Sequence, residues 1–166
     1  MFILGHIGFS FAALYGLKRR VKDIDYRLLL LGSMLPDIID KPLGLVVLKD
    51  ILYNGRLVAH TLLFASLVTL LAFGGKSMKL KLLSMGIWLH LLFDMMFLYP
   101  RTLLWPGLGN FMPLDYHADF MAQLVSNPYT YLSEAAGLAF LSYIFFRHRL
   151  YRKGIFLEFL KTGRLE

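Results

Sequence analysis

The chain has 166 residues, of which 57% are hydrophobic and 17% are charged. Soluble globular domains are usually about 45–50% apolar and about 25% charged, so this composition favours a small membrane protein with one domain over residues 1–166. The chain has no cysteine, which excludes disulfide bonds and thiolate ligands, so any metal would be held by nitrogen and oxygen atoms.

The net charge of +7 would also suit a nucleic-acid-binding protein, but the distribution of the basic residues argues against nucleic acid as a partner. Fourteen of the 18 Lys and Arg residues lie beside apolar segments, within residues 18–27, 76–81 and 147–164. Such residues gather on the cytoplasmic side of membrane proteins. The pattern predicts an integral cell-membrane protein among membrane lipids, with its N-terminus outside and its C-terminus in the cytoplasm.

Five apolar segments are long enough to be predicted as transmembrane helices, so the expected fold is all-α and polytopic. They are Phe2–Leu17, Arg27–Leu48, Leu57–Phe73, Leu80–Tyr99 and Tyr131–Phe146. The first has no basic region before it and no cleavage motif after it, so we expect a retained span and not a signal peptide.

Two further features concern the second segment and the tail. Pro36 removes a backbone donor, which predicts that the second helix is broken near Asp37, beside a polar cavity. The tail at 147–166 combines apolar and basic residues, as a cytoplasmic amphipathic helix does, and a frayed terminus is an equal alternative.

Ionisable side chains lie inside the apolar segments, where a charge is costly and points to a functional site. His90 and Asp94 are four residues apart and share one face of a helix, a spacing typical of metal ligands. Other candidates in the outer half of the predicted spans are His6, Asp37, Asp40, His60 and Glu134. Because Lys and Arg alone define the predicted topology, this shared depth favours one site near the outer membrane face.

Three residues near these candidates have a second interpretation. Asp37 could cap the start of a helix, and Asp40 could pair with Lys41 or Arg56 in place of binding a metal. Arg56 lies four residues before His60 and suits an anionic group of a substrate, although its long side chain could also extend to the membrane interface.

Glu134 and His117 leave more alternatives open. Glu134 could be a ligand, a general base or a partner for Arg101. His117 lies in the long connection after the fourth segment, where exposed loop residues are expected. A site of imidazoles and carboxylates with an open position lowers the pKa of metal-bound water to about 7, which provides a nucleophile for hydrolysis. The expected catalytic carboxylates are Asp37, Asp94 and Glu134.

The order of the candidate ligands resembles a known family. The motifs are Gly5-His6, Gly32-Ser-Met-Leu-Pro36-Asp37, Arg56-Leu-Val-Ala-His60-Thr61, His90-Leu-Leu-Phe-Asp94 and Thr102-Leu-Leu-Trp-Pro106. In this order they look like the membrane-bound metal-dependent hydrolases, whose bacterial member is a LexA-regulated inner-membrane protein. The resemblance covers residues 1–106.

That family is similar in ligand order to zinc-dependent phospholipase C and P1-type nucleases, which are all-helical and use clustered zinc ions. The ligands that the resemblance implies are His6, Asp37, His60, His90 and Asp94. It implies a divalent metal, zinc, with Asp94 as the bridging ligand. Two departures reduce the expected number to one or two ions. The soluble enzymes use a terminal amine and a Trp where this chain has Met1, and an HxxxE pair where His117 and Glu134 are seventeen residues apart.

The expected function is metal-dependent hydrolysis of a phosphoester in a lipid or lipid-linked substrate at the outer membrane face, with Arg56 binding the substrate. A transporter of metal ions or small solutes is an alternative, because broken helices and midplane carboxylates also occur in transporters. Five spans without a repeat are few for alternating access, so a transporter would need a homo-oligomer, which stays open. A structural membrane protein, whose buried polar groups hold helices together, is a second alternative.

Overall fold

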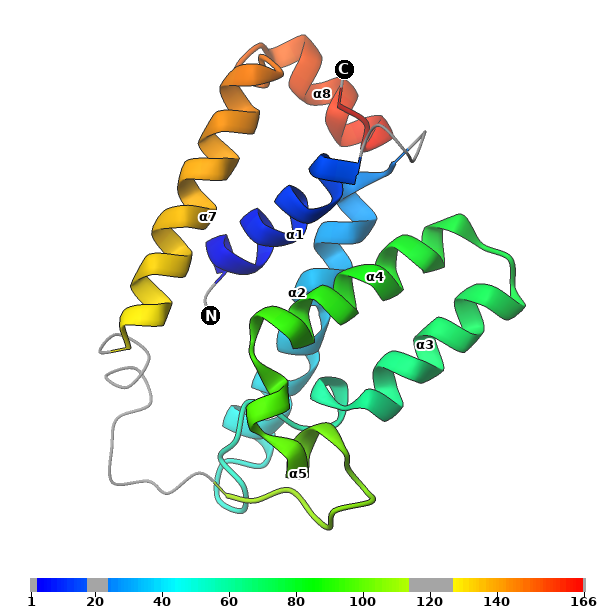
Figure 1. Ribbon diagram of the computed structural model, residues 1–166, viewed down its shortest axis with the longest axis vertical. Helices are drawn as coiled ribbons and strands as arrows, with labels where there is room; N and C mark the ends of the chain where they lie inside the picture. Colours follow the sequence, from blue (N-terminus) through cyan, green and yellow to red (C-terminus); the bar gives the residue numbers. More distant parts are fainter. Residues whose placement is uncertain (1–2, 18–23, 114–126, 166) are drawn as a thin grey trace.

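The computed structural model describes residues 3–17, 24–113 and 127–165, which form helices joined by turns and loops (Figure 1). The longer helices are α1 (Ile3–Leu17), α2 (Tyr26–Pro42), α3 (Leu62–Gly74), α4 (Met78–Phe93), α7 (Pro128–Arg147) and α8 (Lys153–Thr162). The shorter ones are η1 (Leu43–Val47), η2 (Val58–His60), η3 (Met96–Leu98) and α5 (Pro100–Leu103). No strand occurs in the described ranges, so the expected all-α class is confirmed.

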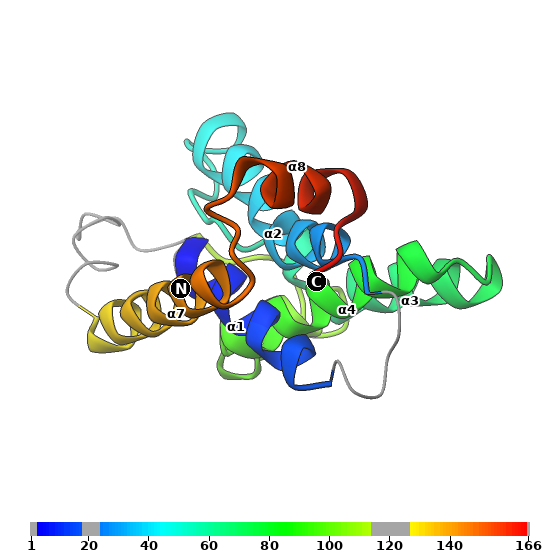
Figure 2. The same ribbon diagram turned by 90° about the horizontal axis from the view of Figure 1, so that it is seen from above.

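The main helices are arranged in the order α7, α1, α2, α4, α3 across the molecule (Figure 2). α7 packs on α1, α1 on α2, α2 on α4, and α4 on α3. The most extensive of these contacts joins α2 to α4. These two neighbouring helices carry the polar residues of the candidate site, so their contact fixes its geometry.

Two glycines allow α2 and α4 to approach closely. A Cβ atom at Gly32 would overlap the backbone of Leu83, and one at Gly86 would overlap the backbone of Leu29. Glycine has no Cβ, so the two backbones can meet at these points. Apolar side chains fill the space on either side of this crossing, with Leu29 and Ile87 fully buried.

The predicted break of the second helix near Pro36 is wrong. α2 runs without interruption from Tyr26 to Pro42 and continues as the π-helix η1. A proline in a helix interior costs about 3 kcal/mol, because it removes a hydrogen bond and its ring crowds the carbonyl of residue i−4. That residue is Gly32, which packs directly against α4, and this contact stabilises the helical path through the proline. The irregular backbone begins only after Pro42.

The five apolar segments predicted from the sequence coincide with helices once the short η helices are included. The fourth segment departs most, because α4 ends at Phe93 and Met95 adopts a left-handed conformation with φ of 52°. None of the helices in the described ranges combines the length and the apolar content needed to cross a bilayer. The five transmembrane spans and the single domain therefore stay predictions.

The tail contains the helix α8, which is tied to the start of α2. The Tyr26 amide donates to the Gly163 carbonyl at 2.9 Å, and the Arg27 guanidinium donates to the Leu160 carbonyl at 2.6 Å. Arg27 also forms an ion pair with Asp25 at 2.7 Å. The hydrogen bonds that Arg27 donates to the Asp25 carboxylate hold the pKa of this group below its ordinary value. These contacts favour the helical tail over the frayed one.

Candidate metal centre

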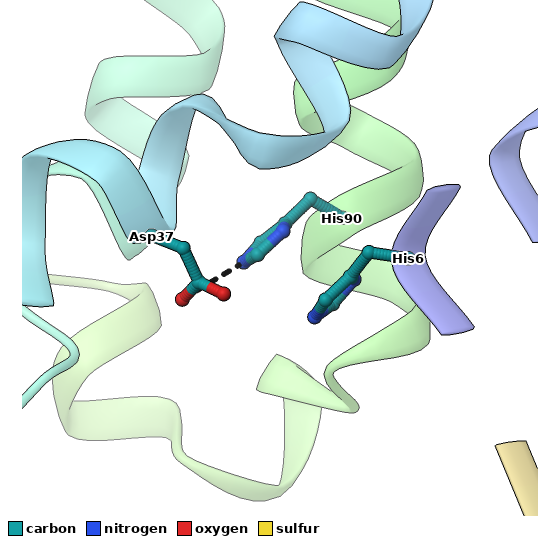
Figure 3. Close-up of side chains that lie close together, drawn as sticks. All are labelled: His6, Asp37 and His90. Atoms are coloured by element: carbon teal, nitrogen blue, oxygen red, sulfur yellow. Dashed lines mark ion pairs between the residues drawn. The ribbon is translucent and has the colours of Figure 1, made fainter. Parts of the chain in front are cut away.

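The five predicted metal ligands meet in one buried group, which we call the His–Asp cluster. Its members are His6 from α1, Asp37 from α2, His60 from η2, His90 from α4 and Asp94, the residue that caps the C-terminus of α4. The three imidazoles are fully buried, and the side chains of Asp37 and Asp94 are 8% and 6% exposed. Figure 3 shows that His6, Asp37 and His90 converge from three different helices.

The distances between the ligating atoms suit a single small cation. His60 Nε2 lies 3.1 Å from His90 Nε2 and 3.6 Å from Asp37 Oδ1. His90 Nε2 lies 3.9 Å from the same Asp37 oxygen, and His6 Nε2 lies 3.6 Å from Asp94 Oδ1. Ligands at about 2.0–2.1 Å around a tetrahedral zinc ion are roughly 3.3 Å apart. Two triplets with ligand atoms within 4.8 Å of one another, His6–Asp37–His90 and His60–His90–Asp94, share His90.

The hydrogen bonds of His60 and His90 define which ring nitrogens face the cluster. His60 Nδ1 lies 2.7 Å from a carboxylate oxygen of Asp40, and His90 Nδ1 lies 2.7 Å from the Ser33 carbonyl oxygen. Both oxygens are acceptors, so each neutral ring carries its proton on Nδ1 and turns the lone pair of Nε2 toward the other ring. Two lone pairs 3.1 Å apart repel each other unless a proton or a metal cation lies between or beside them. A divalent metal would supply that positive charge.

His6 adds a second observation that fits a metal. Both of its ring nitrogens are buried without a hydrogen-bond partner among the described residues. Leaving a buried polar atom unpaired costs about 1–3 kcal/mol. A metal ion bound to one of the two His6 nitrogens would remove that cost. The His6 ring stacks on His90 with centroids 4.1 Å apart and planes 15° apart, which aligns its edge with the cluster.

Asp40 supports the cluster from behind. Its carboxylate accepts from the backbone amides of Leu57, Ala59 and His60 at 2.7, 3.1 and 3.1 Å, besides its bond to the His60 ring. These contacts include neither Lys41 nor Arg56, the alternative partners expected for Asp40. The role of Asp40 as a metal ligand stays a prediction. A carboxylate that holds the second nitrogen of a metal-binding His is a common supporting arrangement.

Two cations lie against the carboxylates of the cluster. Lys41 Nζ donates to Asp37 Oδ2 at 2.7 Å, one helical turn away, and Arg56 Nε donates to Asp94 Oδ2 at 2.8 Å. The Arg56 guanidinium also lies over the Tyr99 ring, 4.6 Å from its centre. The predicted substrate-binding Arg56 is thus at the site. Sequence reasoning missed the pairing of Lys41 with Asp37, although their spacing of four in a helix could have suggested it.

Glu134 belongs to α7, and its side chain lies beside the N-terminal end of α1. Its two oxygens accept from the backbone amides of Leu4 and Gly5 at 3.0 and 2.9 Å, next to the crossing where Gly8 meets Gly137. These amides belong to the first turn of α1 and have no partner within the helix. The predicted catalytic role of Glu134 stays a prediction, whereas these contacts favour holding α1 and with it His6.

His117, the candidate in the long connection, lies outside the described residues. Arg101, the expected alternative partner of Glu134, instead donates to the Met112 sulfur at 2.8 Å. The residues that sequence reasoning did not connect to the site are Ser33 and Lys41. Ser33 acts through its backbone carbonyl, so no side-chain pattern could have revealed it.

The fold and the cluster define an all-helical protein with a buried imidazole–carboxylate centre that could hold a divalent metal. The chain belongs to the YdjM inner membrane protein family, whose model matches residues 1–154. This confirms the expected membrane family and supports a membrane location. The family description names no reaction, and nothing in the comparison supports the hydrolase or phospholipase part of the resemblance. No curated protein and no solved structure matches the chain.

Proposed function

We propose that this protein is a membrane-embedded metal-dependent hydrolase acting on a phosphoester of a lipid or lipid-linked substrate. The observation that carries the proposal is the approach of His60 Nε2 to His90 Nε2 at 3.1 Å, with both Nδ1 atoms held by acceptors. Without a positive charge nearby, the two Nε2 lone pairs would repel each other. Imidazole and carboxylate ligands suit zinc.

The residues of the cluster have different roles in the proposed reaction. One or two divalent ions, zinc in the first instance, would be held by His6, Asp37, His60, His90 and Asp94, and would activate water and polarise a phosphoryl oxygen. Asp94 is the proposed bridging ligand. The Arg56 guanidinium orients Asp94 through its 2.8 Å hydrogen bond, and its exposed part is available to an anionic substrate.

The proposed setting is a bilayer, with five helical segments, the cluster near the outer face, the N-terminus outside and the C-terminus in the cytoplasm. Large exposed apolar side chains support this setting. Leu70 on α3 is 70% exposed, Leu132 on α7 is 70% exposed, and Phe146 at the end of α7 is 66% exposed. Exposed apolar side chains of this size suit contact with lipid or protein.

The test is phosphate release by the purified full-length chain in lipid nanodiscs, with bis(p-nitrophenyl) phosphate and short-chain phospholipids as substrates. Chelation should abolish turnover and added zinc should restore it. His90→Ala should lower kcat by more than about a hundredfold, because the cluster loses the ligand that both triplets share. His148→Ala is the matched control, since His148 contacts Tyr15 at 3.1 Å and lies outside the cluster.

The same preparation separates the proposal from its alternatives. Metal flux into proteoliposomes without any hydrolysis would favour a transporter. Folding that is unaffected by metal removal, together with a loss of stability alone in His90→Ala, would favour a structural protein.

A further inference from the structure

Each carboxylate that faces the imidazoles has its own cation on the opposite side. Lys41 Nζ lies 2.7 Å from Asp37 Oδ2, and Arg56 Nε lies 2.8 Å from Asp94 Oδ2. The side chains of the two cations are 34% and 31% exposed, whereas those of the carboxylates are 8% and 6% exposed and the imidazoles are fully buried. Lys41 and Arg56 therefore lie between the buried cluster and solvent.

Lys41 and Arg56 lie on neighbouring pieces of backbone. A Cβ atom at Gly55, the residue before Arg56, would lie 3.4 Å from Lys41 Cγ, so the aliphatic stem of Lys41 runs along the segment that carries Arg56. Asn54 fixes this segment by accepting from the Arg56 amide at 2.9 Å and donating to the Met112 carbonyl at 2.9 Å. The two cations thus lie on neighbouring segments at the exposed edge of the cluster, and we call this edge the mouth.

The charges at this mouth change sign when a metal binds. Asp37, Asp40 and Asp94 contribute three negative charges against the two positive charges of Lys41 and Arg56, so the site with neutral imidazoles is negative by one. A divalent ion makes it positive. The Oδ1 atoms of Asp37 and Asp94 face the imidazoles and the Oδ2 atoms bind the cations, so both ion pairs can persist beside a metal. Each cation has further N–H donors, and an ammonium beside a guanidinium suits the several oxygens of a phosphate group.

We propose that Lys41 and Arg56 together form a phosphate-binding subsite that uses their remaining N–H donors once a metal occupies the cluster. This subsite rests on the proposed function. The group that it would recognise is a phosphate ester anion. An exposed aromatic side chain borders Arg56, since Tyr99 is 48% exposed and lies under the guanidinium. This border suits a phosphate that is attached to an apolar group.

The test is calorimetric titration of the full-length, metal-loaded chain in nanodiscs with inorganic phosphate and, separately, with dihexanoyl phosphatidate. Metal content is measured on each sample. We expect Lys41→Gln and Arg56→Gln each to keep the metal and to weaken phosphate binding by about tenfold or more, because each loses one charge-assisted donor. Lys49→Gln and Arg101→Gln are the matched controls, with the same change of charge, and should bind phosphate as the wild type does.

The outcomes separate this subsite from the hydrolase itself. Phosphate binding that is unchanged in Lys41→Gln and Arg56→Gln overturns the subsite, and so does loss of metal in these variants, which would assign both cations to holding the carboxylates. Phosphate binding that needs both cations, without hydrolytic turnover, supports the subsite and counts against the hydrolase. Tighter binding of phosphatidate than of inorganic phosphate identifies a lipid headgroup, and equal binding identifies free phosphate as the ligand.

Discussion

Asp40 accepts four hydrogen bonds from one turn of the chain, three from backbone amides of residues 57, 59 and 60 and one from the ring of His60. It is fully buried on α2, so its charge is balanced only by these donors and by what His60 binds. The aspartate fixes both the position of η2 and the tautomer of His60. These contacts favour a positioning role for Asp40 in the cluster over a role as a ligand.

Asp40→Asn tests this assignment. An amide keeps the size of the side chain but replaces one acceptor oxygen with a donor, so it cannot accept all four hydrogen bonds. Loss of such a supporting carboxylate typically lowers metal affinity by about 10–100-fold. Competition with a chromophoric chelator measures the affinity, and Asp50→Asn on the exposed turn after η1 is the control. An Asp40→Asn protein with wild-type metal affinity would contradict the assignment.

The sequence could predict the side-chain ligands and could not predict their supports. His90 and Asp94 stand out because charge within apolar sequence is costly, and His6, Asp37 and His60 follow from their shared depth. Ser33 contributes a carbonyl that every residue possesses, so its identity carries no signal. Asp40 lies seventeen residues from Leu57, and only the packing of α2 against η2 brings them together.

At the scale of helices, the crossing of α2 and α4 sets the distance between Asp37 and His90. Gly86 lies at this crossing, and an added Cβ would overlap the backbone of Leu29. Backbone atoms in a helix cannot move aside as the end of a flexible side chain can. The sequence offered glycines in apolar helices but no information about which pairs meet. The same limit explains why Pro36 was expected to break α2, since its compensation comes from packing on a different helix.

Gly86→Ala should destabilise the protein and loosen the cluster together. Overpacking a close contact costs about 1–3 kcal/mol, which thermal unfolding in detergent should detect as a lower Tm. Metal affinity should fall in the same variant because α2 and α4 are forced apart. Gly74→Ala at the end of α3 is the control, since an added Cβ there meets no atom within 4 Å. Equal Tm values for the two variants would contradict this description of the crossing.

For the whole molecule, apolar composition and membership in an inner-membrane family agree on a membrane location. The helix boundaries of α1 and α7 were predictable to within a few residues, because long apolar runs and flanking charges mark them. The end of α2, the start of α3 and the end of α4 were not. α2 gives way to the π-helix η1, and α3 and α4 begin or end next to the cluster residues His60 and Asp94. Local conformation there serves the cluster and departs from the apolar pattern.

The reaction is less constrained than the metal. Five side chains from four elements meet at distances of 3.1–3.9 Å in a buried volume, which is a demanding arrangement to assemble without a cation. Substrate recognition depends on fewer contacts, those of Lys41 and Arg56 at the mouth. The presence of the metal is therefore the claim on which the rest of the account depends.

Elemental analysis of the purified full-length chain, after loading with zinc and removal of free metal, tests that claim most directly. We predict one or two equivalents of divalent metal in the wild type and in His148→Ala, and a loss of at least one equivalent in His90→Ala and Asp94→Ala. A wild-type protein without stoichiometric metal, or His90→Ala and Asp94→Ala proteins with unchanged metal content, would contradict the account.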